Sequence, residues 1–272
     1  MTTRSIGSDL TQGSIPRHLL RVALPMLVGN LINTGYNVVD AIWIGRIVGK
    51  EAMGAVAVSF PVIFLFVAVA AGATMATTIL VSQYYGARNS VQLEKTVGTS
   101  FLMAIVLGIV LSIAGILSTD SVLRMLGTPE VIVPQASPYL KISFFGFTII
   151  YLSFLVTSIL RGVGDTKTPL LFMATGVAVN AVLDPLFIIG LGPFPRWGLN
   201  GAAIASILSS IVALGMGIRY LNTKGGVISF RPIKQGFDPA TALTIVRIGF
   251  PSMLQQSAVS LGLAAVTSFV NK

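Results

Sequence analysis

Two aspartates, Asp40 and Asp184, lie within long apolar stretches of this 272-residue sequence, whereas the other acidic residues lie in polar segments or at the ends of apolar ones. An ionised aspartate near the middle of a bilayer costs about 2.5 to 3.5 kcal/mol on insertion scales. Each side chain must therefore face a cavity or a partner, or carry a proton. The pair predicts a site that binds a proton or a small cation within a membrane.

Polar residues accompany both aspartates at helical spacing. Positions i, i+3, i+4 and i+7 share one face of a helix, and this spacing joins Asn33, Tyr36, Asn37 and Asp40. Asn180 precedes Asp184 by one helical turn and shares its face. We expect these two polar faces to line one cavity.

Pro185 follows Asp184 directly. Because proline has no backbone N–H, the carbonyl of Ala181 loses its usual helical partner and a bend is favoured. A freed carbonyl beside a carboxylate suits a proton or a small cation. We predict that Pro185 is a hinge whose shape follows the protonation of Asp184.

Transmembrane helices are the elements that must position these residues. The sequence is 54% strongly apolar and 10% charged, whereas roughly a quarter of an ordinary soluble domain is charged. Apolar runs of about 20 residues, long enough to cross a bilayer, predict spans at residues 18–45, 53–82, 96–118, 139–160, 168–191, 198–220 and 244–270. The sequence therefore predicts an all-α, polytopic transmembrane helix bundle and excludes a water-soluble globule.

The composition also excludes several kinds of site. With no cysteine and one histidine, the chain offers no disulfide framework, thiolate metal site or histidine cluster. An intramembrane enzyme would need a second motif, such as two acids at DxxxD spacing or a serine with a base, and we find neither. We expect no enzyme activity, no cofactor and no metal site.

Basic residues are distributed unevenly among the predicted loops. If the N-terminus is inside, cytoplasmic segments hold 12 of the 18 lysines and arginines. This bias predicts a multi-pass protein of the cell inner (plasma) membrane with a cytoplasmic N-terminus, and the lipid bilayer as a partner. The net charge of +9 is then a consequence of topology, and nucleic acid is not expected as a partner.

The segment 221–243 is a long, basic connection that contains glycine and proline. After it, Arg247 and Pro251 repeat the spacing of Arg21 and Pro25, each pair at the start of an apolar helix. Repeated lobes are common in transporters, although Pro in a first helical turn is also common in general. We predict an N-terminal lobe at 1–220, a cytoplasmic linker at 221–243, and the first helix of a C-terminal lobe at 244–272, with the remainder of that lobe missing from the chain.

The sequence resembles the multidrug and toxic compound extrusion (MATE) family. The nine residues from Arg161 to Pro169, Arg-Gly-Val-Gly-Asp-Thr-Lys-Thr-Pro, resemble the connection between the fourth and fifth helices of that family. Pro25 and the stretches 39–45, 83–87 and 180–185 fit the same family. The likeness is greatest to its bacterial DinF-like branch.

The resemblance implies an antiporter that exports organic cations, drugs and amphipathic toxins by alternating access, driven by inward proton or sodium flow. It assigns the coupling cation to Asp40, Asp184 and Asn180. It also implies a substrate cavity lined by Asp40, Asn33, Tyr36, Asn37 and Tyr139.

Protons are expected in preference to sodium. Sodium sites in the family can use a hydroxyl early in the sixth helix, whereas here Gly201-Ala202-Ala203 offers none before Ser206. A sodium-coupled exporter remains an alternative. A flippase for lipids or lipid-linked saccharides from the same superfamily is another, but it would need a strongly basic cavity, and the predicted spans lack interior lysine or arginine.

The charge bias yields a test of orientation. Because the chain has no cysteine, a single cysteine at Thr223 reports the side of the membrane on which the linker begins. We expect Thr223→Cys to resist a membrane-impermeant thiol reagent added to intact cells and to react after permeabilisation. Labelling of Thr223→Cys in intact cells would show that the linker lies outside, which contradicts the predicted topology.

Overall fold

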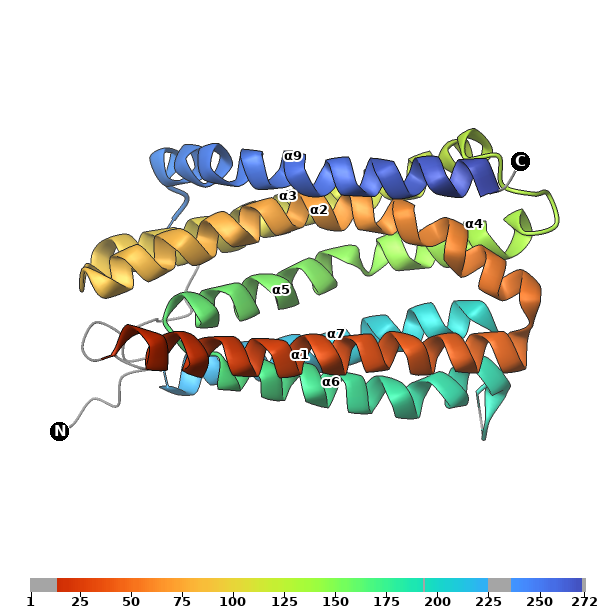
Figure 1. Cartoon of the computed structure of the whole chain (residues 1–272), viewed down its shortest axis with the longest axis horizontal. Helices are drawn as coiled ribbons and strands as arrows, with labels where there is room; N and C mark the ends of the chain where they lie inside the picture. Colours follow the sequence, from red (N-terminus) through yellow and green to blue (C-terminus); the bar gives the residue numbers. More distant parts are fainter. Residues whose placement is uncertain (1–13, 193, 225–235, 271–272) are drawn as a thin grey trace.

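The computed structural model describes residues 14–192, 194–224 and 236–270, which form helices and contain no β-strand. Several helices are continuous with a π-helical segment or with one another (Figure 1). In chain order the elements are α1 (Ile15–Trp43), η1 (Ile44–Val48), α2 (Lys50–Gly86), α3 (Ser90–Met125), α4 (Val133–Phe145), α5 (Phe147–Gly162), α6 (Lys167–Pro185), η2 (Leu186–Gly190), α7 (Leu199–Lys224) and α9 (Pro239–Val270).

Each predicted span coincides with a helix or with two consecutive helices. Judged by length and apolarity, the described residues contain four helices able to cross a membrane, namely α2, α3, α6 with η2, and α7, and a fifth if α4 and α5 count as one bent span. Seven spans were expected. Helices α1 and α9 are outside this set although both are long, and Asn30, Asn33 and Asn37 make the middle of α1 more polar.

The prediction of one continuous helix over 139–160 is wrong. Helices α4 and α5 meet at Gly146 and are bent by 49° relative to each other. A Cβ atom on Gly146 would lie 2.2 Å from the Ile207 side chain of α7. A residue with a Cβ atom would force α7 away from the bend, so glycine allows this close packing.

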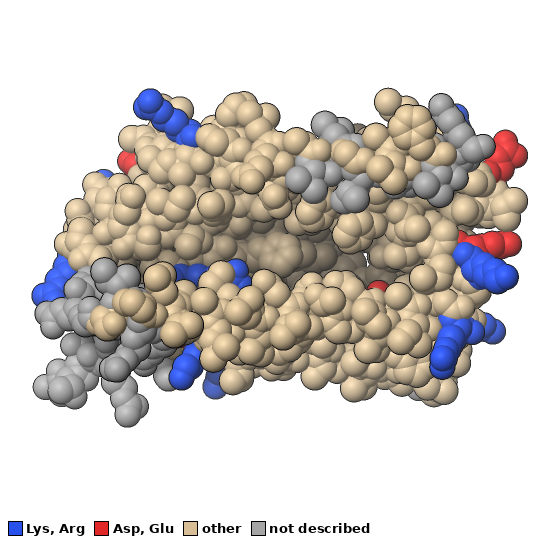
Figure 2. Space-filling model, viewed as in Figure 1, with Lys and Arg blue, Asp and Glu red and all other residues tan. Residues whose placement is uncertain are grey.

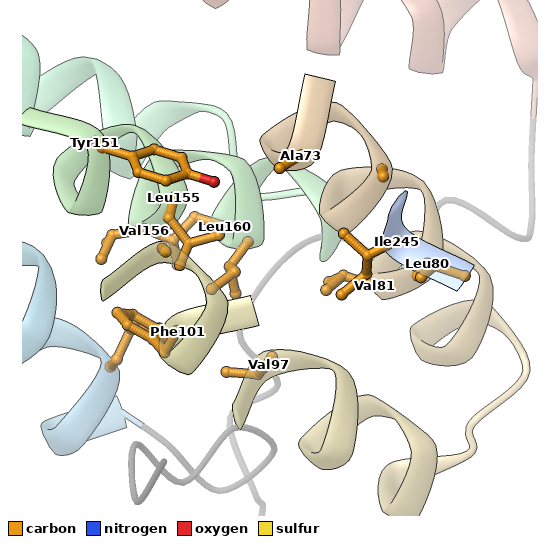
Figure 3. Close-up of a cluster of buried hydrophobic side chains, with 14 of the residues drawn as sticks. Ala73, Leu80, Val81, Val97, Phe101, Tyr151, Leu155, Val156, Leu160 and Ile245 are labelled. Carbon is orange, nitrogen blue, oxygen red and sulfur yellow. The ribbon is translucent and has the colours of Figure 1, made fainter. Parts of the chain in front are cut away.

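Two groups of helices make up the bundle (Figure 1). Helix α2 packs against α9, α3 and α5, while α1 packs along α6 and α6 against α7. Helix α5 contacts both groups. Figure 3 shows the core of the first group, in which Val81 of α2, Phe101 of α3 and Leu155 of α5 lie together with Ile245 of α9.

The surface separates charged ends from an apolar middle. Figure 2 shows lysine, arginine and acidic side chains at the two ends of the molecule and almost none between them on this face. Large apolar side chains point outward from the middle of the helices, as with Leu31 at 72% exposure and Leu117 at 78%. In water this surface would be unfavourable, but it matches the hydrocarbon of a bilayer.

The motif between Arg161 and Pro169 forms the turn that starts α6. Gly164 has a left-handed backbone, with φ of +81°, and Asp165 accepts a hydrogen bond from the Thr168 backbone N–H at 3.0 Å. This is an N-terminal cap, which supplies one of the partners that a helix start lacks. The Tyr220 hydroxyl donates to the same carboxylate at 2.9 Å, so the cap also fixes the end of α7.

Asp238 caps α9 in a similar way. Its carboxylate accepts hydrogen bonds from the side-chain hydroxyl and the backbone N–H of Thr241. These bonds hold the pKa of Asp238 below its usual range. Its own N–H donates to Thr99 of α3 at 3.2 Å, which attaches the start of α9 to the first group of helices.

Gly201 determines how closely α7 approaches η2. A Cβ atom at this position would lie 2.6 Å from the carbonyl carbon and oxygen of Phe187, and a backbone cannot rotate away as a side chain can. We expect Gly201→Ala to lower the free energy of unfolding by about 1–3 kcal/mol. Thermal unfolding in detergent measures the change.

Gly215→Ala is the matched control in the same helix. No atom lies within 4 Å of the position that its Cβ would occupy, and alanine favours a helix over glycine. Its melting temperature should equal or slightly exceed that of the unsubstituted chain. Equal melting temperatures for the two variants would contradict the proposed close contact at Gly201.

Candidate functional site

The structure brings Asp40 and Asp184 together. Asp40 lies one turn before the end of α1 and Asp184 near the end of α6, and these helices pack along each other. The two carboxyl groups are within hydrogen-bonding reach of each other. Asp184 is only 1% exposed, and Asp40 is half-buried.

Each carboxyl group retains one buried oxygen, Oδ1, that has no hydrogen-bond partner among the described residues. Neither aspartate forms an ion pair with a described lysine or arginine. Lys141 pairs with a different acid, Asp120, with its Nζ atom 2.7 Å from the Asp120 Oδ2 atom. Two carboxylates this close repel each other, and a carboxyl oxygen can gain a partner only from an added donor or cation. A proton shared by the pair would supply that donor.

Asn180 connects the acid pair to α7. Its side chain is buried one turn before Asp184. In the amide orientation that satisfies its neighbours, the nitrogen donates to Asp184 Oδ2 at 2.7 Å and the oxygen accepts from the Ser206 backbone N–H at 3.1 Å. Asn180 therefore stabilises the charged form of Asp184.

Two tyrosines complete the cluster. The hydroxyl of Tyr36 on α1 is hydrogen-bonded to Ser206 Oγ at 3.1 Å. Tyr139, from α4, lies close enough to both aspartates to interact with them electrostatically. The site thus combines side chains from α1, α4, α6 and α7.

Asn33 and Asn37 lie on α1, two turns and one turn before Asp40. Both side chains are exposed, and Asn37 donates to Asn33 Oδ1 at 3.2 Å. Tyr36 and Asp40 on the same helix reach Ser206 of α7 and Asp184 of α6. A hollow opens between the layer of α1 and the layer of α2 and α9, with an acidic side chain visible at its margin (Figure 2).

Both acid-bearing helices change their hydrogen-bonding pattern near the site. The π-helical segment η2 begins directly after Pro185, and η1 begins four residues after Asp40. The two π-helical segments contact each other. Such segments are rare and occur frequently at functional sites. Pro185 continues the helix into η2, and its movement as a hinge remains a prediction.

Ser206 is the site residue that sequence reasoning missed. Residues 201–203 offer no hydroxyl, but Ser206, the first hydroxyl of α7, lies one turn beyond Ala202 on the same face and reaches both Tyr36 and Asn180. Its i+4 spacing from Ala202 was the available signal.

No group of three or more histidine, cysteine or acidic side chains suited to a metal lies within the described ranges.

Comparison with known proteins supports the resemblance seen in the sequence. Residues 25–186 match the MatE family. The probable multidrug resistance protein YoeA of Bacillus subtilis is 32% identical over 95% of this chain and 56% of its own length. A protein named FAD transporter, from Shewanella oneidensis, is 31% identical over 76% of this chain and 46% of its own length.

A solved structure shares the fold. It is described as the outward-facing conformation of a multidrug resistance MATE family transporter of the MOP superfamily, and it superposes with a TM-score of 0.84 at 30% identity, over 94% of this chain and 57% of that one. The chain thus spans about half the length of the relatives it matches. Because the family match covers more than half of the chain and the helix bundle is shared, the chain belongs to the MATE family of integral membrane transporters, which are not enzymes.

Proposed function

We propose that this chain is the N-terminal lobe, with the first helix of the C-terminal lobe, of a proton-coupled antiporter that exports organic cations and amphipathic small molecules. The observation that carries the proposal is the contact between Asp40 and Asp184, each with one buried oxygen that has no hydrogen-bond partner in the described part of the chain. One proton satisfies both groups, and its release leaves a negative site that attracts a cationic substrate.

Coupling between proton entry and substrate export then follows from competition between the two for the acid pair. A proton and an organic cation both reduce the negative charge of the acid pair, so the binding of one disfavours the other. Alternating access of two lobes would expose this site to each side of the membrane in turn. We place the N-terminus in the cytoplasm, which puts both acids in the outer half of the inner membrane, about two-thirds or more of the way along their helices.

The polarity of the site favours cationic over anionic substrates. One relative is named an FAD transporter, and a dinucleotide carries phosphates that basic side chains would have to neutralise. The described cluster contains two aspartates, two tyrosines, Asn180 and Ser206, and no lysine or arginine among them. The same argument disfavours a flippase for lipid-linked saccharides.

The hydrogen bonds around the pair favour a proton over sodium. A metal cation needs several oxygen ligands at once. Here the Asn180 oxygen, Asp184 Oδ2 and Ser206 Oγ each already take part in a hydrogen bond within the cluster, so a sodium ion would have to share these oxygens. A proton needs only the unpaired carboxyl oxygens.

The acid pair is tested in the complete transporter reconstituted in vesicles. Asp40→Asn and Asp184→Asn should abolish export of ethidium driven by a proton gradient, because an amide cannot bind and release the coupling proton. A sodium gradient without a proton gradient should drive no export by the unsubstituted protein. Fluorescence of the dye reports transport in each case.

Asp120→Asn serves as the control. Asp120 is exposed at the end of α3 and paired with Lys141, so its loss should leave proton-driven export unchanged. Undiminished proton-driven export by either site variant would contradict the proposed mechanism. Export driven by a sodium gradient alone would show that sodium, and not the proton, is the coupling ion.

The hinge at Pro185 is a second element of the proposal. The residue before it changes charge during the cycle, and the helix continues directly into η2. Pro185→Ala restores a backbone donor and should slow coupled export while the protein stays folded. Structures at pH 5 and pH 8 should differ in the shape of α6 and η2. A constant shape, together with normal export by the variant, would make Pro185 a static packing residue.

A further inference from the structure

Three basic residues lie near one another in the chain or in the fold at the end of the bundle where α1 ends. Arg46 lies in η1, Lys50 begins α2, and Arg196 lies in the loop between η2 and α7. All three are exposed, and basic side chains project from this end of the molecule in Figure 2. The topology proposed above places this end on the outer side, where fewer lysines and arginines are expected than on the cytoplasmic side.

Tight folding of the loop holds Arg196 against the end of η1. Gly190, the last residue of η2, has φ of +79°, and a Cβ atom on it would lie 2.7 Å from the Arg196 backbone nitrogen. The Arg196 guanidinium donates to the Ile47 carbonyl at 3.5 Å. Since Ile47 directly follows Arg46 and precedes Lys50 by three residues, the fold brings a third charge to the segment that carries the other two.

None of these three charges forms an ion pair in the part of the chain that the structure describes. Glu51, which follows Lys50, is directed to α4, where its carboxylate accepts a hydrogen bond from the Gln135 side chain at 3.3 Å. At the turn between α3 and α4, by contrast, Lys141 is paired with Asp120. Neighbouring cations without an acidic partner repel one another, so an added anion would be stabilised among them.

Aromatic side chains lie beside this basic group. The rings of Phe194 and Trp197 pack on Phe187 of η2, with ring centroids 5.0 and 5.3 Å away. The Trp197 backbone N–H also donates to the Phe187 carbonyl at 3.0 Å. Phe194 and Trp197 each remain 40% exposed. Exposed tryptophan is typical of the depth at which hydrocarbon meets the lipid headgroups, so the basic group lies at the depth of the lipid phosphates.

We propose that Arg46, Lys50 and Arg196 bind the phosphodiester of an anionic phospholipid in the outer leaflet, with its acyl chains against Phe194 and Trp197. Arginine holds phosphate oxygens through parallel N–H groups, and lysine adds a point charge. A free phosphate ion would satisfy the charges alone, whereas a lipid also covers the exposed rings. This site is separate from the acid pair and does not depend on which ion drives transport.

The bound lipid would also stabilise the contact between the ends of α1 and α6. Helix α1 continues into η1 and α6 into η2, and the two π-helical segments contact each other. The three cations around this contact repel one another when no anion is bound. The complete transporter should therefore melt at a higher temperature in mixed micelles that contain phosphatidylglycerol than in those that contain phosphatidylcholine.

Quenching of tryptophan fluorescence measures lipid binding at this place. The complete transporter is reconstituted in phosphatidylcholine vesicles with a minor share of phosphatidylglycerol brominated on its acyl chains. The fluorescence of Trp197 is the difference between the unsubstituted protein and its Trp197→Phe variant. Brominated phosphatidylglycerol should quench it more than the same share of brominated phosphatidylcholine, because a bound lipid is enriched beside the ring.

Removal of one charge should weaken the preference for the anionic lipid. Arg46→Gln and Lys50→Gln alter exposed side chains, so the fold should be retained. Each should lower the relative affinity for phosphatidylglycerol about fivefold, because a basic side chain near an anionic membrane surface contributes about 1 kcal/mol. Arg196→Lys keeps the charge and should retain most of the preference, whereas Arg196→Gln should lose it as the other two variants do.

Arg124→Gln is the matched control. Arg124 is exposed at the same end of the bundle, at the end of α3, but it lies close enough to Asp120 to interact with that carboxylate. Its removal should leave the quenching by phosphatidylglycerol unchanged. An equal loss of quenching in Arg124→Gln and Arg46→Gln would show only a general effect of net charge and would overturn the proposal.

Inorganic phosphate distinguishes a lipid site from a site for a free anion. At constant ionic strength, added phosphate should leave the quenching of Trp197 unchanged, whereas unbrominated phosphatidylglycerol should relieve it. Relief by phosphate would assign the site to a free anion and overturn the proposal. Equal quenching by the two brominated lipids in the unsubstituted protein would overturn it as well. These measurements involve no transport, so they stand apart from the test of the acid pair.

Discussion

Two carboxyl groups lie against each other, one buried and one half-buried, with no basic partner among the described residues, and the site depends on this constraint. Asp40 and Asp184 lie in a protein whose surface is apolar between its two ends, so neither charge can be relieved by bulk water at low cost. The surroundings offer one amide donor to Asp184 and leave an oxygen of each acid unpaired. A site built in this way responds to the arrival of a proton or a cation, because that arrival removes the largest unfavourable interaction in it.

The fold holds this arrangement by close approach between particular helices. Glycines let α7 approach both the bend at Gly146 and the backbone of Phe187, which places Ser206 beside α6. Helix α1, by contrast, packs along α6 and borders the hollow seen in Figure 2. Asp184 of α6 is fully buried, and Asp40 of α1 is half-buried.

Several features followed from the sequence because they depend on composition and on spacing along a single helix. Charges are rare within the spans, so Asp40 and Asp184 were conspicuous, and the i+4 rule connected Asn180 to Asp184. The bend at Gly146 left no comparable signal, since a glycine within an apolar run is compatible with a straight helix. Ser206 was likewise unremarkable until a second helix was placed against its face.

The sequence by itself determined that the chain is a membrane-embedded helix bundle with an acid pair, because the exclusion of charge from hydrocarbon acts on every residue separately. Only the tertiary structure decided which polar side chains meet. The rotation of each helix about its axis and the height at which helices cross are set by contacts such as those at Gly146 and Gly201, which no periodicity within one helix encodes. For this reason Tyr36 and Asp40 turned towards α6 and α7, whereas Asn33 and Asn37, predicted on the same face, remained exposed.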